Sequence, residues 1–268
     1  MATKFWIVDT FSRKAFGGNP SAVFLLDDFG DEKLLQNVAM EIKTPETIFI
    51  KNLQDGKFES RFFSPNSAGL NLGNGLFAAA EIIKLNDPKI TNFSIVHGAE
   101  VFVVNVLEDK SVRIRFQTAK LNKASVPPNI ASALNREIVV SISESEGDLI
   151  VEMRSPKKLF KLSPNMDILQ NIGYTSFILT ADTHYEVGVN YDFCARVFAP
   201  KLGFFADTMS PLAYVKLASY WSERMQKTDL VGTQDPVNGE HVSIGCSQEF
   251  TYLIGTSVIT TIGEMLAF

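Results

Sequence analysis

The segment Arg61-Phe62-Phe63-Ser64-Pro65 decides the fold, because its pattern returns at Arg196-Val197-Phe198-Ala199-Pro200. In both segments an Arg, a Phe and a Pro stand at the same spacing, with a small residue before the Pro. Each segment is followed by a loop of about ten residues and then by a mostly apolar helical pattern. This shared order of strand, loop and helix predicts two pseudo-symmetric lobes.

The two helical patterns are apolar over much of their surface. The first, residues 73–85, carries Leu76, Phe77, Ala79, Ala80, Ile82 and Ile83 around most of its circumference. The second, residues 211–225, carries Leu212, Val215, Leu217, Ala218 and Trp221. A helix that is apolar on nearly all sides is buried, so we expect the first to lie inside a wrapped sheet.

Short runs rich in β-branched and aromatic residues predict strands around the first helical pattern. These runs are residues 5–11, 23–26, 47–50, 58–63 and 93–96, and a helix is expected over 32–41. Residues 100–107 and 112–116 flank a turn and predict a hairpin. The segment 118–129 has little periodicity and contains Pro127-Pro128, which places a domain seam there. The predicted lobes are residues 1–118 and 119–268, and the last strand could return to the first lobe.

The composition is that of a globular protein, with 268 residues, 46% hydrophobic and 21% charged. The net charge of −5 argues against nucleic acid or an anionic membrane as the main partner. No signal peptide or membrane-spanning run is expected, so the cytoplasm is the predicted location. Cys194 and Cys246 do not form a metal-binding motif, and we interpret His97, His184 and His241 as structural or surface residues.

Several segments together resemble one family. Residues 16–23, Phe-Gly-Gly-Asn-Pro-Ser-Ala-Val, resemble an F-x-G-N-P-A-A-V opening, and residues 44–49 resemble S-E-T-A-F. Residues 61–65 resemble R-W-F-T-P, while residues 196–200 and Asp207 resemble an F-A-P segment followed by D-P-x-T-G-S-A. These are motifs of the phenazine-biosynthesis-type (PhzF-like) isomerases, and the resemblance covers most of the chain.

The resemblance implies a diaminopimelate-epimerase-like α+β fold with two pseudo-symmetric lobes. Each lobe would be a curved, mostly antiparallel sheet around a central helix, with a site between the lobes that needs no cofactor or metal. The implied activity is isomerisation or epimerisation of a small carboxylate-bearing metabolite. A homodimer is a further expectation.

Glu46 is the main catalytic candidate. The resemblance implies that it is the general acid/base that moves a proton on the carbon skeleton of the substrate. Such a carboxylate must be removed from water, which a cleft would achieve. From the residues alone, a solvated loop glutamate before a strand is the commoner case.

The start of the first apolar helix departs from the family pattern C-G-H-A-T, since this chain has Leu72-Gly73-Asn74-Gly75-Leu76. Gly-Asn-Gly resembles diaminopimelate epimerases, but Leu72 stands where their catalytic Cys would be. Backbone N–H groups at Gly73, Asn74 and Gly75 could bind a substrate carboxylate. The alternative is a tight junction that needs glycine geometry and an Asn cap.

The second helix start departs as well, because Pro211 and Tyr214 replace the family's Gly and His. Asp207 is retained and is predicted to assist Glu46. Ser210 is a candidate substrate-binding residue, and its side chain is expected to cap the helix by accepting from the amide of Leu212 or Ala213. We therefore expect this start to bind anions poorly.

Two functions stay open at this point. The retained Glu46 and Asp207 favour an isomerase that acts by acid/base proton transfer. The replaced His and Cys positions favour a catalytically impaired relative that binds a small molecule or acts as a scaffold.

Overall fold

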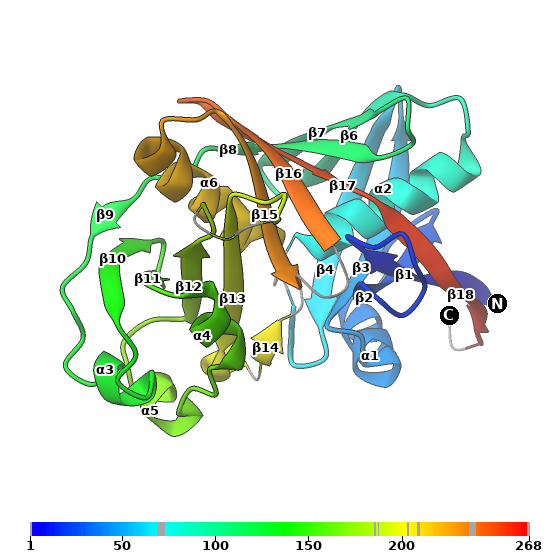
Figure 1. Cartoon of the computed structure of the whole chain (residues 1–268). Helices are drawn as coiled ribbons and strands as arrows, with labels where there is room; N and C mark the ends of the chain where they lie inside the picture. Colours follow the sequence, from blue (N-terminus) through cyan, green and yellow to red (C-terminus); the bar gives the residue numbers. More distant parts are fainter. Residues whose placement is uncertain are drawn as a thin grey trace. The chain divides into compact units, whose positions relative to one another are not determined.

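The computed structural model of the chain describes residues 2–68, 73–184, 186, 188–202, 204–207, 210–235 and 240–266 (Figure 1). The side chains of residues 67, 68, 204–207, 235 and 240 lie outside this description. The chain forms two compact units, one from residues 1–116 together with 252–268, and one from residues 117–251. Among the described residues, no helix combines the length and the apolar character that a membrane span needs.

The elements up to the first unit's hairpin alternate strands with two helices. They are β1 (Thr3–Thr10), β2 (Asn19–Leu26), α1 (Glu32–Ile42), β3 (Glu46–Gln54), β4 (Lys57–Ser64), β5 (Ser67–Ala68), α2 (Asn74–Asn86), β6 (Asn92–His97), β7 (Glu100–Val106) and β8 (Val112–Gln117).

The remaining elements include three short helices and one long helix. They are β9 (Asn122–Lys123), α3 (Ile130–Ala133), β10 (Val139–Ser145), β11 (Asp148–Met153), α4 (Pro156–Lys161), α5 (Met166–Gln170), β12 (Ser176–Asp182), β13 (Phe193–Ala199), the 3-10 helix η1 (Pro200–Leu202), β14 (Phe204–Asp207), α6 (Pro211–Met225), β15 (Asp229–Asp235), β16 (Glu240–Cys246), β17 (Phe250–Gly255) and β18 (Ser257–Met265).

The two units repeat one order of strand pairing. In the first unit β1–β2 is antiparallel, β2–β3 parallel, β3–β4 antiparallel, β4–β6 parallel and β6–β7 antiparallel. In the second unit β10–β11, β11–β12, β12–β13, β13–β15 and β15–β16 follow the same alternation. Parallel neighbours need a crossover connection, and helices lie in the crossovers of both units. The predicted duplication of strand, loop and helix is confirmed.

The helix α2 is the centre of the first unit. It packs against β1, β2, β3 and β18, and nine of its residues, from Asn74 to Ile83, are buried. On the other face of the sheet, α1 packs against β3 and β4 over a hydrophobic cluster that contains Phe24, Phe49 and Phe63. The ring centroids of Phe24 and Phe49 are 5.0 Å apart. The predicted burial of α2, the helix expected over residues 73–85, is therefore confirmed.

The second unit has the same division between a buried helix and covering helices. The helix α6 packs against β15 and β16, and Tyr214, Leu217 and Trp221 are among its buried residues. The short helices α3, α4 and α5 contribute Ala133, Leu159 and Leu169 to a separate core cluster with β11, β12 and β13.

The two arginines of the repeated segment each contact the covering layer of their own unit. The Arg61 guanidinium lies 4.6 Å from the ring centroid of Phe29, which precedes α1. Arg196 Nη1 donates to the backbone oxygens of Leu159 and Leu162, at 3.1 and 2.5 Å, at the end of α4. A contact between sheet and covering helices therefore accounts for Arg at both positions.

Candidate active site

Glu46 is the first residue of β3 and lies beside Ser21 in the parallel pairing of β2 with β3. The residue is 1% exposed. The interpretation of Glu46 as a solvated loop residue is therefore wrong. A carboxylate in this position has been removed from water, which is the condition that proton transfer from a weak carbon acid requires.

One side-chain oxygen of Glu46 accepts a hydrogen bond from the start of α2. The Gly75 backbone N–H donates to Glu46 Oε2 at 2.6 Å. The N-cap of α2 is Gly73, with a φ of 90°, and it has no side chain to cap the helix. Glu46 therefore satisfies one of the N–H groups that a helix N-terminus leaves unpaired. The amide in turn offsets part of the cost of burying a carboxylate.

The Gly75 amide, expected to bind a substrate carboxylate, is thus engaged by Glu46. Asn74 is the first residue of α2 and not its cap, so the expected Asn cap is wrong, whereas the expected glycine geometry is confirmed at Gly73, whose φ is 90°. Asn74 is 1% exposed, and its Oδ1 lies 3.1 Å from the hydroxyl of Thr10. The same hydroxyl lies 3.1 Å from the backbone oxygen of Asn19. Thr10 therefore links Asn74 to the Gly-Asn-Pro segment.

The Gly-Asn-Pro segment shapes the loop between β1 and β2. A Cβ at Gly18 would lie 2.4 Å from the backbone oxygen of Thr10, so only glycine fits there. Asp9 Oδ2 accepts a hydrogen bond of 2.7 Å from the backbone N–H of Phe16, which has a φ of 67°. This network fixes the end of β1 where Thr10 meets Asn74.

At the second helix start, Ser210 is the N-cap of α6 as predicted, but its side chain makes no capping hydrogen bond. The expected bond to the amide of Leu212 or Ala213 is therefore wrong. The Ser210 backbone N–H donates to Gln234 Oε1 at 3.0 Å, and the Ser210 backbone oxygen accepts from the N–H of Tyr214 at 3.1 Å. A side chain from β15 thus binds this helix start.

Two other candidate positions have side chains outside the described part of the chain. Asp207 is the last residue of β14, and its side chain lies outside the described part of the chain. Leu72, the position of the epimerase Cys, lies outside the described residues. The roles assigned to Asp207, Gly73, Asn74 and Ser210 stay predictions.

The three histidines contact backbone atoms or neighbouring side chains, and the thiol of Cys194 is buried. His97 Nδ1 lies 3.1 Å from the backbone oxygen of Ser60, and the His241 ring packs 5.2 Å from that of Tyr191. The His184 backbone N–H donates to Asp182. Burial raises the pKa of Cys194 to about 12, so its thiol is not a ready nucleophile.

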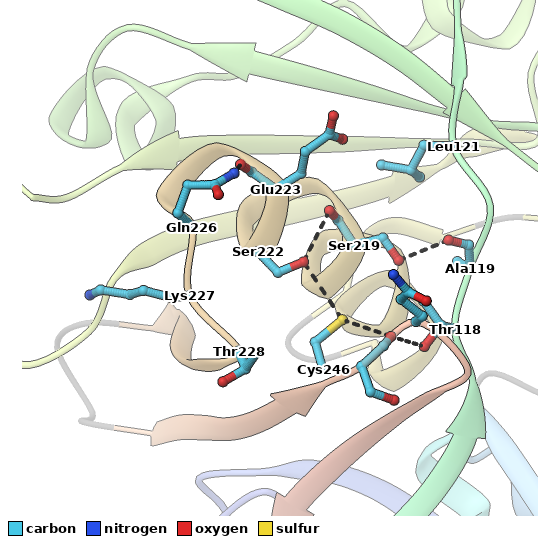
Figure 2. Close-up of a pocket in the computed structure, with 12 residues that line it drawn as sticks. Thr118, Ala119, Leu121, Ser219, Ser222, Glu223, Gln226, Lys227, Thr228 and Cys246 are labelled. Carbon is cyan, nitrogen blue, oxygen red and sulfur yellow. Dashed lines mark hydrogen bonds between the residues drawn. The ribbon is translucent and has the colours of Figure 1, made fainter.

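The second unit contains a hollow of about 620 Å³ that no sequence motif indicates (Figure 2). It is lined by Thr118, Ala119, Leu121, Ser219, Ser222, Glu223, Gln226, Lys227, Thr228, Cys246, Ser247 and Gln248. Figure 2 shows hydrogen bonds between the lining residues, including Ser219 Oγ to the Ala119 oxygen at 2.8 Å. Glu223 is exposed, and Lys227 pairs with Asp192 at 2.6 Å. The carboxylate of Glu223 in this hollow is therefore a poorer candidate for proton transfer than the buried carboxylate of Glu46.

The contact between Glu46 and Gly75 was also missed. Each residue was identified from its motif, but 29 positions separate them. The common family pattern, with Ala at the position of Gly75, gave no signal that this residue contacts the carboxylate.

Comparisons with known proteins agree on one family. The family model for phenazine biosynthesis-like proteins matches residues 8–243. An uncharacterized isomerase of Halalkalibacterium halodurans is 27% identical and is covered over 99% of both chains. A phenazine biosynthesis-like domain-containing protein of Bos taurus is 31% identical, over 91% of this chain and 92% of the relative.

Solved structures share the fold. A phenazine biosynthesis protein of the PhzF family from Enterococcus faecalis has a TM-score of 0.87 at 24% identity, over 99% of both chains. A hydroxyproline epimerase from Agrobacterium vitis has a TM-score of 0.64 at 9% identity, over 98% of this chain and 91% of that one. These neighbours confirm the predicted epimerase-like α+β fold. Because the family model covers most of its length, the chain belongs to the phenazine biosynthesis-like (PhzC-PhzF) family, whose curated relatives include proteins named isomerases.

Proposed function

We propose that this protein is a cofactor-independent isomerase that moves a proton on a small carboxylate-bearing metabolite, with Glu46 as the proton-transfer group. The single observation that carries the proposal is the burial of Glu46 at the start of β3, with its carboxylate bonded to the Gly75 amide. Burying a carboxylate is costly, and a neutral side chain could fill the same space. The presence of Glu46 there therefore supports a role that needs its charge. Membership of the family supports the same reaction class.

The reaction needs a base and an acid at one carbon skeleton. Glu46 accepts the proton from a carbon next to a carbonyl or carboxylate group, and the electrons of that C–H bond move into an enolate-like system. The carboxylic acid of Glu46 then returns the proton to a different carbon of that system, and the double bond moves as the new C–H bond forms, which completes the isomerisation. Asn74 and the Gly73 amide are proposed to orient the substrate, and Asp207 to assist the transfer.

Deuterium exchange from heavy water tests this function. The purified protein is incubated with a panel of amino and hydroxy acids, and deuterium at carbon is measured by mass spectrometry or NMR. The wild type should exchange at least one compound, and Glu46→Gln should not. Gln keeps the size of the side chain and an acceptor for the Gly75 N–H, but it cannot hold the proton at neutral pH.

The matched control is Glu223→Gln, which makes the same change at an exposed carboxylate in the hollow of the second unit. This variant should exchange at the wild-type rate. Exchange that persists in Glu46→Gln would transfer the role to another group, with Asp207 the first to replace.

A second function is favoured by one specific observation. Asn74, a side chain that cannot transfer a proton, is buried where the family pattern has His. A non-catalytic carboxylate-binding protein would bind compounds of the same panel, raising its melting temperature, without any exchange of deuterium. Stabilisation without exchange, in both the wild type and Glu46→Gln, would favour this function.

A further inference from the structure

The start of α2 and the start of β3 meet at a position without room for a side chain on the helix. A Cβ at position 75 would lie 3.0 Å from Phe62 Cε1, 3.1 Å from Glu46 Cδ and 3.2 Å from Glu46 Oε2. All three contacts are tighter than most real Cβ contacts, so the neighbouring atoms would have to move by a few tenths of an ångström. Phe62 and Glu46 are each 1% exposed, so neither has open water into which to move.

This requirement for glycine comes from space and not from backbone conformation. Gly75 lies inside α2, whereas Gly73, two residues earlier, has the positive φ of a left-handed residue. Gly75 is the second residue of α2, and alanine is the better helix former, by about 1 kcal/mol in a helix interior, so helix formation does not favour glycine at position 75. The contact with Glu46 favours glycine instead, because glycine lets the carboxylate approach the N–H to 2.6 Å.

We propose that Gly75 is the positioning residue of Glu46: its amide and its missing side chain together fix the carboxylate and favour the ionised, proton-accepting form. An N–H that donates to Oε2 stabilises the carboxylate over the carboxylic acid. The catalytic consequence rests on the proposed function of Glu46, but the geometry can be tested without it.

The first test uses the wild-type protein. The backbone amide signal of Gly75 is followed by NMR through a pH titration of ¹⁵N-labelled protein. It should move with one titration, and this movement should vanish in Glu46→Gln, whose side chain can still accept the hydrogen bond but does not ionise. A Gly75 amide that does not respond to pH in the wild type would overturn the proposal.

The second test moves the carboxylate. Glutamate is labelled with ¹³C at its side-chain carboxyl, and the Glu46 signal is identified by its loss in Glu46→Gln. In Gly75→Ala the titration midpoint of Glu46 should rise by about half a pH unit or more, because the N–H donor is displaced. Gly173→Ala is the control, since a Cβ there meets no atom within 4 Å. An unchanged midpoint in folded Gly75→Ala contradicts the proposal.

Failure of the proposed function gives a different pattern. If the Gly75 amide follows the titration of Glu46 but no compound exchanges deuterium, the positioning holds and the isomerase proposal fails. If exchange depends on Glu46 but the Gly75 amide is silent, the positioning fails alone. Where both hold, the pH profile of exchange should move to higher pH in Gly75→Ala.

Discussion

The ammonium group of Lys216 lies 2.6 Å from Asp148 Oδ2, which joins the central helix of the second unit to the start of β11. The two side chains are only 10% and 18% exposed. Glu146, in the turn before β11, lies 3.7 Å from the same ammonium group but is 77% exposed. The pair of Lys216 and Asp148 is therefore largely removed from water, where each charge depends on the other.

Replacing Lys216 by Met should destabilise the protein by about 3 kcal/mol, because it leaves the Asp148 charge without its partner. The free energy of unfolding is measured by denaturant titration. Adding Asp148→Asn to Lys216→Met should recover most of the loss, since the uncompensated charge is then gone. Lys227→Met is the control: its pair with Asp192 is half exposed on the Lys side, and the change should cost less than about 1 kcal/mol.

Because of Cys194, the free energy of unfolding should depend on pH in the alkaline range. Burial, as the largest cause, raises the pKa of its thiol from 9.0 to about 12. In the unfolded chain the thiol loses its proton near pH 9, while in the folded protein it stays protonated until about pH 12. Its contribution is therefore intact below pH 9 and is lost as the pH rises from there toward 12.

The measurement compares the wild type with Cys194→Ala, which has no thiol to titrate. The difference in unfolding free energy between the two proteins should fall by about 2 kcal/mol, to the disadvantage of the wild type, between pH 8 and pH 11. Cys194→Ala loses some packing, but this cost does not depend on pH. A difference that stays constant over this range would show that the thiol is not held protonated by the fold.

Gly18→Ala should destabilise the protein by about 2 kcal/mol or more, because its Cβ would lie 2.4 Å from the Thr10 oxygen. Backbone cannot yield as a flexible side chain does, so the end of β1 must shift. The shift should also disturb Asn74, which the Thr10 hydroxyl contacts. Denaturant unfolding and the side-chain amide signal of Asn74 check the two parts, with Gly173→Ala as the control without a clash.

The two repeated arginines should differ in their energetic weight. Arg196→Met removes the donor of two hydrogen bonds to backbone oxygens that end α4, which should cost about 2 kcal/mol. Arg61→Met loses the stacking of the guanidinium on Phe29 but keeps an apolar stem there, so its cost should stay below about 1 kcal/mol. Equal costs in denaturant unfolding would contradict this difference.

Most strands before residue 117 and the two long helices of the fold could be predicted from the sequence, because their apolar patterns are clear. The helix expected over residues 73–85 begins at Asn74 and ends at Asn86, and the helix expected over 211–225 has these bounds. The helices α3, α4 and α5 were missed, since four to six residues are too few to show a helical period. No strand was predicted over residues 139–182, where β10, β11 and β12 lie.

Only part of the candidate site could be predicted. The motif around Glu46 pointed to the carboxylate, but its burial depends on strands and a helix far from it in sequence. The partner of the Gly75 amide is likewise decided by tertiary packing, so the amide was interpreted as open to a substrate. The contacts of Ser210, the N-cap of α6, also depend on a distant residue. The Gln234 side chain, 24 positions away, accepts from the Ser210 backbone N–H, and this contact has no signal in the local sequence.

The pairing of β1 with β18 gives the first unit a particular order of assembly during protein synthesis. Residues 3–10 pair on one side with β2 and on the other with residues 257–265. Because β18 is synthesised after all of residues 117–251, the ribosome has already delivered the whole second unit when this strand emerges. The contiguous second unit is thus complete in the emerging chain before β18 follows, whereas one side of β1 in the first unit stays uncovered until then. The unit that is translated first is therefore the one that is completed last.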